Sequence, residues 1–230
     1  MPLLDDDAFC RRVSRFRRII MVGPSHMRYK FNYISLRCYH VFGPDERRHG
    51  SARVNGTTFL LLQFMANISH LWTMHLDPMN LTKDDAVIIQ HGSHNVSRIG
   101  LRHTLDTTLN TYFDRLKAIQ RHSELLGFRL VVLTSPPLND RKKRRRVDGR
   151  NPFSLAVLAR LAHTRLSVAG IDVFDEFAAL LSHYNQDAPP CDGHYLCPNR
   201  EDGLFVGRCG IVAVHLLLRH LAGEFDIITC

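Results

Sequence analysis

The sequence predicts a three-layer α/β domain built around a mainly parallel β-sheet, for three reasons. Short apolar runs at residues 19–22, 85–90 and 129–134 have the length and composition of strands that are buried on both faces. Between these runs, apolar residues recur every three or four positions, as they do on one face of an amphipathic helix. Each run also stops at glycine, proline or polar residues. Strands that alternate with helices are typical of a parallel sheet covered on both sides.

The first half of the chain carries the predicted central strand and helix. The run at 19–22 is stopped by Gly23-Pro24, and Met27, Phe31 and Ile34 then follow at helical spacing. In order, the predicted elements are a basic lead-in with a short helix (5–18), a strand (19–22), a helix (25–35), a short strand (37–41), a loop (44–55) and strands at 58–64 and 85–90.

The second half continues the alternation of helices and strands. Leu105, Leu109 and Leu116 share one face of a long helix that ends near Gly127, and the next strand stops at Pro136-Pro137. In order, we expect a helix (101–127), a strand (129–134), a helix (152–170), a short strand (171–174) and a closing helix (212–221). The sequence contains no internal repeat.

The composition predicts a single domain. The chain has 230 residues, of which 45% are hydrophobic and 23% charged, as in an ordinary globular protein. We divide it into a basic lead-in at 1–18 and one α/β domain at 19–230, with a basic loop at 139–150. Residues 141–150 contain seven basic residues and one acidic residue, so this loop supplies +6 of the net charge of +8.

The basic loop has three interpretations: a nuclear-localisation or nucleic-acid patch, a protease site, and a solvated loop that attracts anionic glycans or membranes. The run has no interleaved aromatic residues, which argues against specific nucleic-acid recognition. We therefore favour the solvated loop, with an anionic partner held by Arg141, Lys142, Lys143, Arg144, Arg145 and Arg146.

The compartment remains open on sequence grounds. No apolar run approaches the length of a membrane span, and the first residues lack the shape of a secretory signal, so we expect a soluble chain. The six cysteines lack C-x-x-C spacing, which argues against zinc. N-glycosylation sequons begin at Asn55, Asn67, Asn80 and Asn95 and favour a lumenal or extracellular site, provided that an anchor precedes this sequence. Without such an anchor, we expect a cytoplasmic protein.

Ser25 lies on the turn between the first predicted strand and its helix. In α/β proteins the carboxyl ends of the strands form the ligand crevice, and helix amides there face developing negative charge. Ser25 is therefore a candidate nucleophile. The alternative interpretation is that Ser25 caps the helix, a common role of serine.

Three blocks together resemble the SGNH (GDSL-type) hydrolase superfamily: Gly23-x-Ser25-x-x-Arg28, Gly92-x-x-Asn95 and the late pair Asp192-Gly193-His194. The likeness extends from about residue 19 to residue 215 and is greatest for the PC-esterase-like and glycan O-acyltransferase-like branch. Two departures stand out. Pro24 replaces the family's aspartate, and one residue separates Asp192 from His194 where the family has two.

The resemblance implies a serine mechanism. Ser25 is the nucleophile, His194 is its base, and Asp192 orients the imidazole, with Asp187 or a backbone carbonyl as substitutes for that carboxylate. The oxyanion hole is assigned to the Ser25 amide, Asn95 and a glycine of the second block, for which Gly56 is preferred to Gly50.

The remaining implied contacts are with substrate. Arg28, Gly92 and His94 are assigned to substrate binding, although Arg28 is equally well explained as a surface ion pair. The expected function is a serine esterase or O-acyltransferase that acts on an acylated glycan or small ester, without a metal or organic cofactor. The alternative is a catalytically weak or inactive binding module that uses the basic loop for anionic partners.

Overall fold

The computed structural model describes residues 6–39, 50–54, 56–63, 68, 70–90, 109–137, 152–181 and 208–224. Its elements include a π-helical turn, η1, and a 3-10 turn, η2. In chain order they are α1 (Asp6–Val13), β1 (Arg18–Gly23), α2 (Ser25–Tyr39), β2 (Gly50–Val54), β3 (Thr57–Gln63), η1 (Trp72–Leu76), η2 (Asp77–Met79), β4 (Asp85–Gln90), α4 (Leu109–Leu126), β5 (Arg129–Leu133), α5 (Pro152–Val168), β6 (Asp172–Phe174), α6 (Glu176–Leu180) and α7 (Arg208–Leu221).

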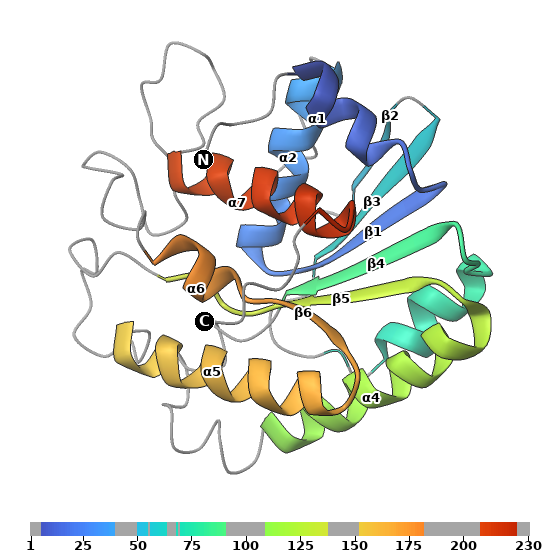
Figure 1. Cartoon of the computed structure of the whole chain (residues 1–230). Helices are drawn as coiled ribbons and strands as arrows, with labels where there is room; N and C mark the ends of the chain where they lie inside the picture. The colour runs from blue at the N-terminus through green and yellow to red at the C-terminus, as the bar shows by residue number, and fades with distance from the viewer. Residues whose placement is uncertain are drawn as a thin grey trace.

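The described strands form one six-stranded sheet in the order β2-β3-β1-β4-β5-β6 (Figure 1). All neighbouring strands are parallel except β2, which pairs antiparallel with β3 at one edge. The predicted mainly parallel sheet is therefore confirmed, with β1 and β4 in its interior.

Helices cover both faces of the sheet, which gives the predicted three layers. Alternate residues of β1 point to opposite sides: Met21 packs with α1, α2 and α7, whereas Ile20 and Val22 pack with α4 and α5. All of β1 after its first residue is buried. Burial on both faces explains why this strand is a continuous apolar run instead of an alternating one.

Two predicted elements are wrong. Residues 37–39 continue α2 instead of beginning a strand, because nothing in that stretch breaks the helix and its end is tied to α1 by a disulfide between Cys38 and Cys10. Residues 50–54, expected as loop, form β2, because the antiparallel hairpin with β3 satisfies their backbone groups. Neither α6 nor the turns of η1 and η2 was predicted.

The α1 helix, which lies within the basic lead-in predicted at 1–18, packs into the core. Phe9 is fully buried and packs edge-on against Tyr33 of α2 and beside His215 of α7. Tyr33 and His215 are themselves hydrogen-bonded at 3.3 Å. None of the helices in the described parts of the chain is long and apolar enough to cross a membrane.

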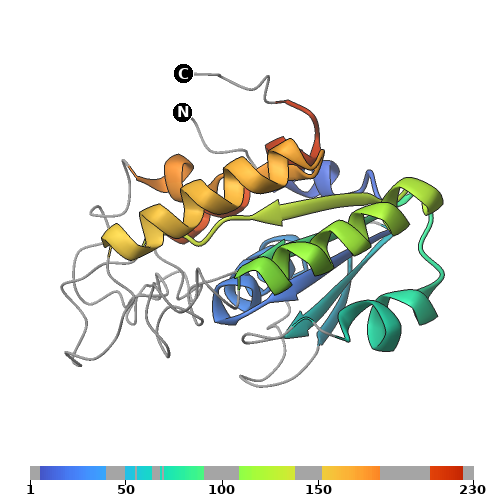
Figure 2. The same ribbon diagram turned by 90° about the horizontal axis from the view of Figure 1, so that it is seen from below.

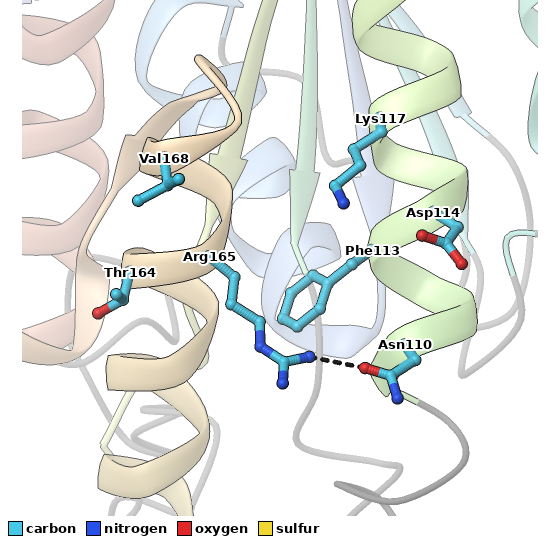
Figure 3. Close-up of a pocket in the computed structure, with 7 residues that line it drawn as sticks. All are labelled: Asn110, Phe113, Asp114, Lys117, Thr164, Arg165 and Val168. Atoms are coloured by element: carbon cyan, nitrogen blue, oxygen red, sulfur yellow. Dashed lines mark hydrogen bonds between the residues drawn. The ribbon is translucent and has the colours of Figure 1, made fainter.

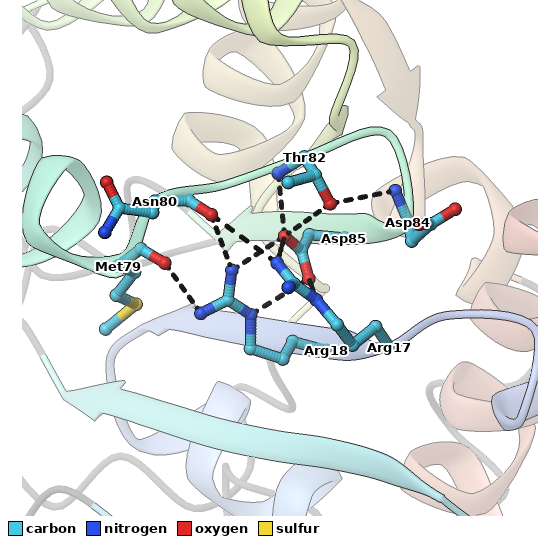
Figure 4. Close-up of polar contacts among 7 residues, drawn as sticks. All are labelled: Arg17, Arg18, Met79, Asn80, Thr82, Asp84 and Asp85. Carbon is cyan, nitrogen blue, oxygen red and sulfur yellow. Dashed lines mark hydrogen bonds and ion pairs between the residues drawn. The ribbon is translucent and has the colours of Figure 1, made fainter.

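An arginine cluster closes the amino edge of the sheet (Figure 4). The fully buried carboxylate of Asp85 accepts hydrogen bonds from Arg17 and Arg18, the shortest being 2.6 Å and 2.8 Å, and from the Thr82 amide at 2.8 Å. Burial alone would raise the pKa of Asp85, but these bonds outweigh it and hold the pKa well below its ordinary value. The cluster joins β1 to β4 at the edge opposite Ser25.

Candidate active site

Ser25 is the first residue of α2 and stands just beyond the carboxyl end of β1. The chain pairs β1 with β3 on one side and with β4 on the other. The strands that follow β1 in the chain therefore lie on both sides of it, with β3 on one side and β4 on the other. The carboxyl end of β1 is thus a switch point of the kind where open α/β sheets bind ligands. The strand-turn-helix placement predicted for Ser25 is confirmed.

The Ser25 hydroxyl does not cap the helix. The Pro24 carbonyl accepts hydrogen bonds from the amides of Met27 at 2.9 Å and Arg28 at 3.3 Å, so Pro24 occupies the N-cap position. Ser25 Oγ is buried, and it has no hydrogen-bond partner within the described part of the chain. A buried hydroxyl in this state costs about 1–3 kcal/mol. An unpaired hydroxyl at this edge of the sheet fits the expectation that Ser25 is a candidate nucleophile.

Gly23 allows the strand and helix to meet closely beneath Ser25. A Cβ atom at this position would lie 3.1 Å from Met27 Cβ, 3.2 Å from Gln90 Cβ and 3.3 Å from the Gln90 carbonyl oxygen. These separations are tighter than ordinary van der Waals contacts, and none of the three partner atoms can move unless the backbone moves. The glycine of the first sequence block is thus explained by the packing of β1, β4 and α2.

A buried charged cluster that the sequence did not predict lies at the same edge of the sheet. Glu176, the first residue of α6, pairs with Lys30 of α2 at 2.7 Å and accepts a hydrogen bond from the Gln90 side chain at 2.6 Å. All three side chains are buried. The cluster joins α2, β4 and α6, the elements adjoining the Ser25 turn, the Asn95 segment and the His194 segment in sequence.

Burial raises the pKa of Glu176, even though the ammonium of Lys30 and the amide of Gln90 act in the opposite direction. The only sequence signal for this residue was its place two positions after the short strand predicted at 171–174. Local spacing could not identify its partners, because 146 and 86 positions separate it from Lys30 and Gln90.

Arg28 is buried, so the surface ion pair considered for it is wrong. Its guanidinium donates to the Tyr29 hydroxyl at 2.8 Å and lies 4.8 Å from the centre of that ring. Arg28 follows Ser25 by three residues, which places both on one side of the first helical turns. The guanidinium itself lies against Tyr29, the next residue of α2.

Gly56 is not brought to Ser25. It lies in the turn between β2 and β3, with a φ of +90°, directly before the amino end of β3. Because β3 is parallel to β1 and Arg18 pairs with Thr58, Gly56 lies at the amino edge of the sheet. At about 3.3 Å per residue, it is roughly 20 Å from the carboxyl edge. The assignment of Gly56 to the oxyanion hole is therefore wrong.

The other predicted site residues lie outside the described residues. Two facts about the described elements bear on them: β4 ends beside the end of β1, since Val22 pairs with Ile89, and residues 182–207 come between α6 and α7 in the sequence. The residues concerned are Gly92, His94, Asn95, Asp192, His194 and the basic run 141–146.

A groove of about 460 Å³ lies elsewhere, between α4 and α5 (Figure 3). The two helices run side by side along one face of the sheet (Figure 2). Arg165 crosses the groove to bind Asn110 at 2.6 Å and lies over the Phe113 ring. No residue of the three sequence blocks is among its described lining residues.

No protein-family model matches the sequence, and a search of curated proteins finds no relative. Solved structures do match. A lipase/acylhydrolase from Enterococcus faecalis has a TM-score of 0.55 at 15% identity, covering 93% of this chain and 98% of that one. A putative acylhydrolase from Bacteroides fragilis has a TM-score of 0.53 at 11% identity, covering 97% and 90%.

The acetylxylan esterase Axe2 from Geobacillus stearothermophilus has a TM-score of 0.50 at 12% identity and covers 91% of this chain and 94% of its own. A serine variant and an aspartate variant of Axe2 are each described as catalytic mutants. At identities this low the likeness concerns the fold. The chain therefore has the SGNH-like three-layer α/β fold that these acylhydrolases and esterases share.

Proposed function

We propose that the protein is a serine esterase or O-acyltransferase and that Ser25 is its nucleophile. The observation that carries this proposal is the Ser25 hydroxyl, buried without a partner in the described structure at the carboxyl end of an interior strand. The fold shared with acylhydrolases and esterases supports the same reaction class. In Axe2 a serine and an aspartate are the sites of catalytic mutants, which supports a serine mechanism on this fold.

In the proposed reaction, Ser25 Oγ attacks the ester carbonyl while His194 accepts the hydroxyl proton and Asp192 orients the imidazole. The oxyanion receives hydrogen bonds from the Ser25 amide and the Asn95 side chain. The Ser25 amide supports this role, because the first amides of a helix have no partner within the helix. The tetrahedral intermediate then releases the alcohol, which takes the proton from His194, and leaves an acyl-serine.

The second half-reaction reverses these roles. Water or a sugar hydroxyl gives its proton to His194 and attacks the acyl-serine, and Ser25 regains its proton as it leaves. Water yields hydrolysis, and a sugar hydroxyl yields acyl transfer. We further propose that the substrate is an acylated glycan or small ester, bound by Arg28, Gly92 and His94. The position of Arg28 three residues beyond Ser25 supports its part in binding.

We propose a replacement for Gly56 as the third oxyanion donor. Gln63, the last residue of β3, pairs with Gly23, so β3 ends at the edge of the sheet that carries Ser25, and residues 64–67 follow it in the sequence. These four residues contain no glycine. A backbone amide of any residue type is a sufficient donor, and we assign the role to this segment.

Hydrolysis of p-nitrophenyl acetate by the wild type and by Ser25→Ala tests the proposal. We expect the variant to lose nearly all turnover. Ser35→Ala is a matched control, because Ser35 lies on the same helix and its hydroxyl is likewise buried without a partner in the described structure. Equal turnover by wild type and Ser25→Ala would instead favour the binding module.

The basic run is assigned to a separate anionic partner. If residues 141–146 hold a sulfated glycan, replacing all six with glutamine should abolish retention on a heparin column. Esterase activity should be unchanged, because the run is not part of the proposed mechanism. Loss of both properties together would show that the run belongs to the catalytic site.

A further inference from the structure

The turn before β4 carries an exposed asparagine within a glycosylation sequon. Asn80-Leu81-Thr82 has the pattern Asn-x-Thr with a residue other than proline in the middle. Of the four sequon asparagines, only Asn80 falls within the described residues. Its side chain can therefore be examined as an acceptor.

The backbone of Asn80 is fixed, whereas its side chain is accessible. The residue is in the left-handed conformation, with φ of 50°, and its carbonyl oxygen accepts a hydrogen bond from Arg18 at 3.1 Å. Its side-chain amide points away from the arginine cluster (Figure 4) and has no hydrogen bond within the described structure. The neighbours Asp77, Lys83 and Asp84 are also exposed, so a bulky polar group would meet solvent and polar side chains.

A second, independent observation bears on the compartment. Cys10 and Cys38, which are 28 positions apart, are joined in a disulfide between α1 and α2. Structural disulfides persist in the secretory pathway and outside the cell, and they are rare in the cytosol. N-linked glycans are attached in that same pathway. The disulfide and the exposed sequon therefore point to one place of synthesis.

We propose that Asn80 carries an N-linked glycan, attached in a secretory compartment in which Cys10 and Cys38 are oxidised. The donor is a lipid-linked oligosaccharide diphosphate. In the transfer, the bond between the first sugar carbon and the diphosphate oxygen breaks, and a bond between that carbon and Asn80 Nδ2 forms. The amide loses one proton to a base of the transferase, and the lipid diphosphate leaves with the bonding electron pair.

A glycan at Asn80 is compatible with the proposed esterase site. Asn80 lies next to Asp85, which pairs with Arg18 at the amino edge of the sheet, whereas Ser25 is at the carboxyl edge. About six strand residues, or roughly 20 Å, separate these edges. The glycan would leave the substrate crevice open, and the two proposals are independent of each other.

Turn chemistry alone offers a competing explanation. Asparagine tolerates the left-handed conformation, and the Thr82 hydroxyl lies 3.3 Å from Asp85 Oδ2 and accepts from the Asp84 amide at 3.4 Å. Both residues thus have a use in the fold without a sugar. Only a direct measurement of Asn80 separates the two explanations.

The test is mass spectrometry of the full-length protein purified from cells of its own species. Thiols are alkylated under denaturing conditions, and the protein is then treated with peptide N-glycosidase in heavy-oxygen water. We expect the Asn80 peptide to be converted to heavy-oxygen-labelled aspartate and Cys10 and Cys38 to resist alkylation until they are reduced. An unlabelled, unmodified Asn80 peptide overturns the proposal, as do free thiols at both cysteines. A digest without the glycosidase controls for spontaneous deamidation.

Three variants expressed in the same cells complete the experiment. Aspartate at position 80 tolerates the left-handed conformation but cannot accept a glycan. The Asn80→Asp variant should therefore migrate faster on a gel, by the mass of one glycan. Thr82→Ser keeps both the hydroxyl and the sequon and should retain the glycan, whereas Thr82→Ala should lose it. Unchanged mobility of Asn80→Asp would also overturn the proposal. Esterase turnover of Asn80→Asp should equal that of the wild type, so loss of the glycan cannot be mistaken for failure of the proposed function.

Discussion

Lys30 and Glu176 form an ion pair, 2.7 Å between Nζ and Oε1, in which only 5% and 0% of the two side chains is exposed. The pair fixes α6 to the middle of α2, and Gln90 adds β4 to the same cluster. Charges buried to this degree are stable only when they are paired.

We predict that replacing one residue of this pair lowers the stability of the fold more than replacing both residues does. Lys30→Met and Glu176→Gln should each lower the free energy of unfolding by about 3–5 kcal/mol, because each leaves a buried polar or charged partner. The double variant should recover part of the loss, as measured by urea denaturation. As a control, Arg12→Met at the partly exposed pair with Glu224 should cost at most about 1 kcal/mol. Additive losses in the double variant would contradict this prediction.

Replacing Ser25 with alanine should leave the fold as stable as before, or more stable by up to about 1 kcal/mol. The reason is that the buried hydroxyl gains no hydrogen bond in the described structure. A helix cap behaves in the opposite way, since its loss costs about 1 kcal/mol. Thermal denaturation of Ser25→Ala therefore separates the two roles considered for this serine. A clear loss of stability would argue for a cap.

Gly23→Ala should impair both the stability and the proposed esterase activity. Its methyl group would stand within 3.3 Å of Met27 and Gln90, so α2 or the end of β4 must shift. Overpacking of this kind costs about 1–3 kcal/mol, and the shift also displaces Ser25. Urea denaturation and p-nitrophenyl acetate turnover measure the two effects. Wild-type values for both would show that the structure around Gly23 accommodates a methyl group without a significant shift of α2 or β4.

Asp85 should make the stability depend on acid pH. Its pKa is lowered in the folded state, so it stabilises the fold above the ordinary aspartate pKa of 3.8, and this contribution is lost as the pH falls below that value. The difference in unfolding free energy between the wild type and Asp85→Asn should therefore shrink with acidification. Denaturation of both proteins from neutral to acid pH measures this difference, with Asp84→Asn at the exposed neighbour as control. A difference that is constant with pH would contradict the assignment.

Local pattern was sufficient for most of the fold. The strand at 85–90 was predicted at its observed bounds, because a run buried on both faces carries a continuous apolar signal. Residues 50–54 were missed, because β2 is polar and becomes a strand only through its pairing with β3. Residues 37–39 were missed because short runs of mixed residues fit a helix and a strand equally well.

The candidate site was less predictable than the fold. Ser25 could be placed because a strand, a turn and a helix are consecutive in the chain. The assignment of Gly56 to the oxyanion hole was wrong because the edge of the sheet at which Gly56 lies depends on the direction of β3. Residue spacing did not reveal that direction. Glu176 was missed because its partners, Lys30 and Gln90, come from distant elements. Long-range pairing therefore limited the prediction at both Gly56 and Glu176.

The three attachments of α2 have a consequence for the proposed esterase reaction. Gly23 seats the start of this helix, Lys30 holds its middle, and Cys38 ties its far end. A proposed nucleophile on so constrained a helix needs little reorganisation when an ester binds, and binding then loses less conformational entropy. Differences in turnover among homologues that share this helix should then originate in the segments around α2 and not in α2 itself.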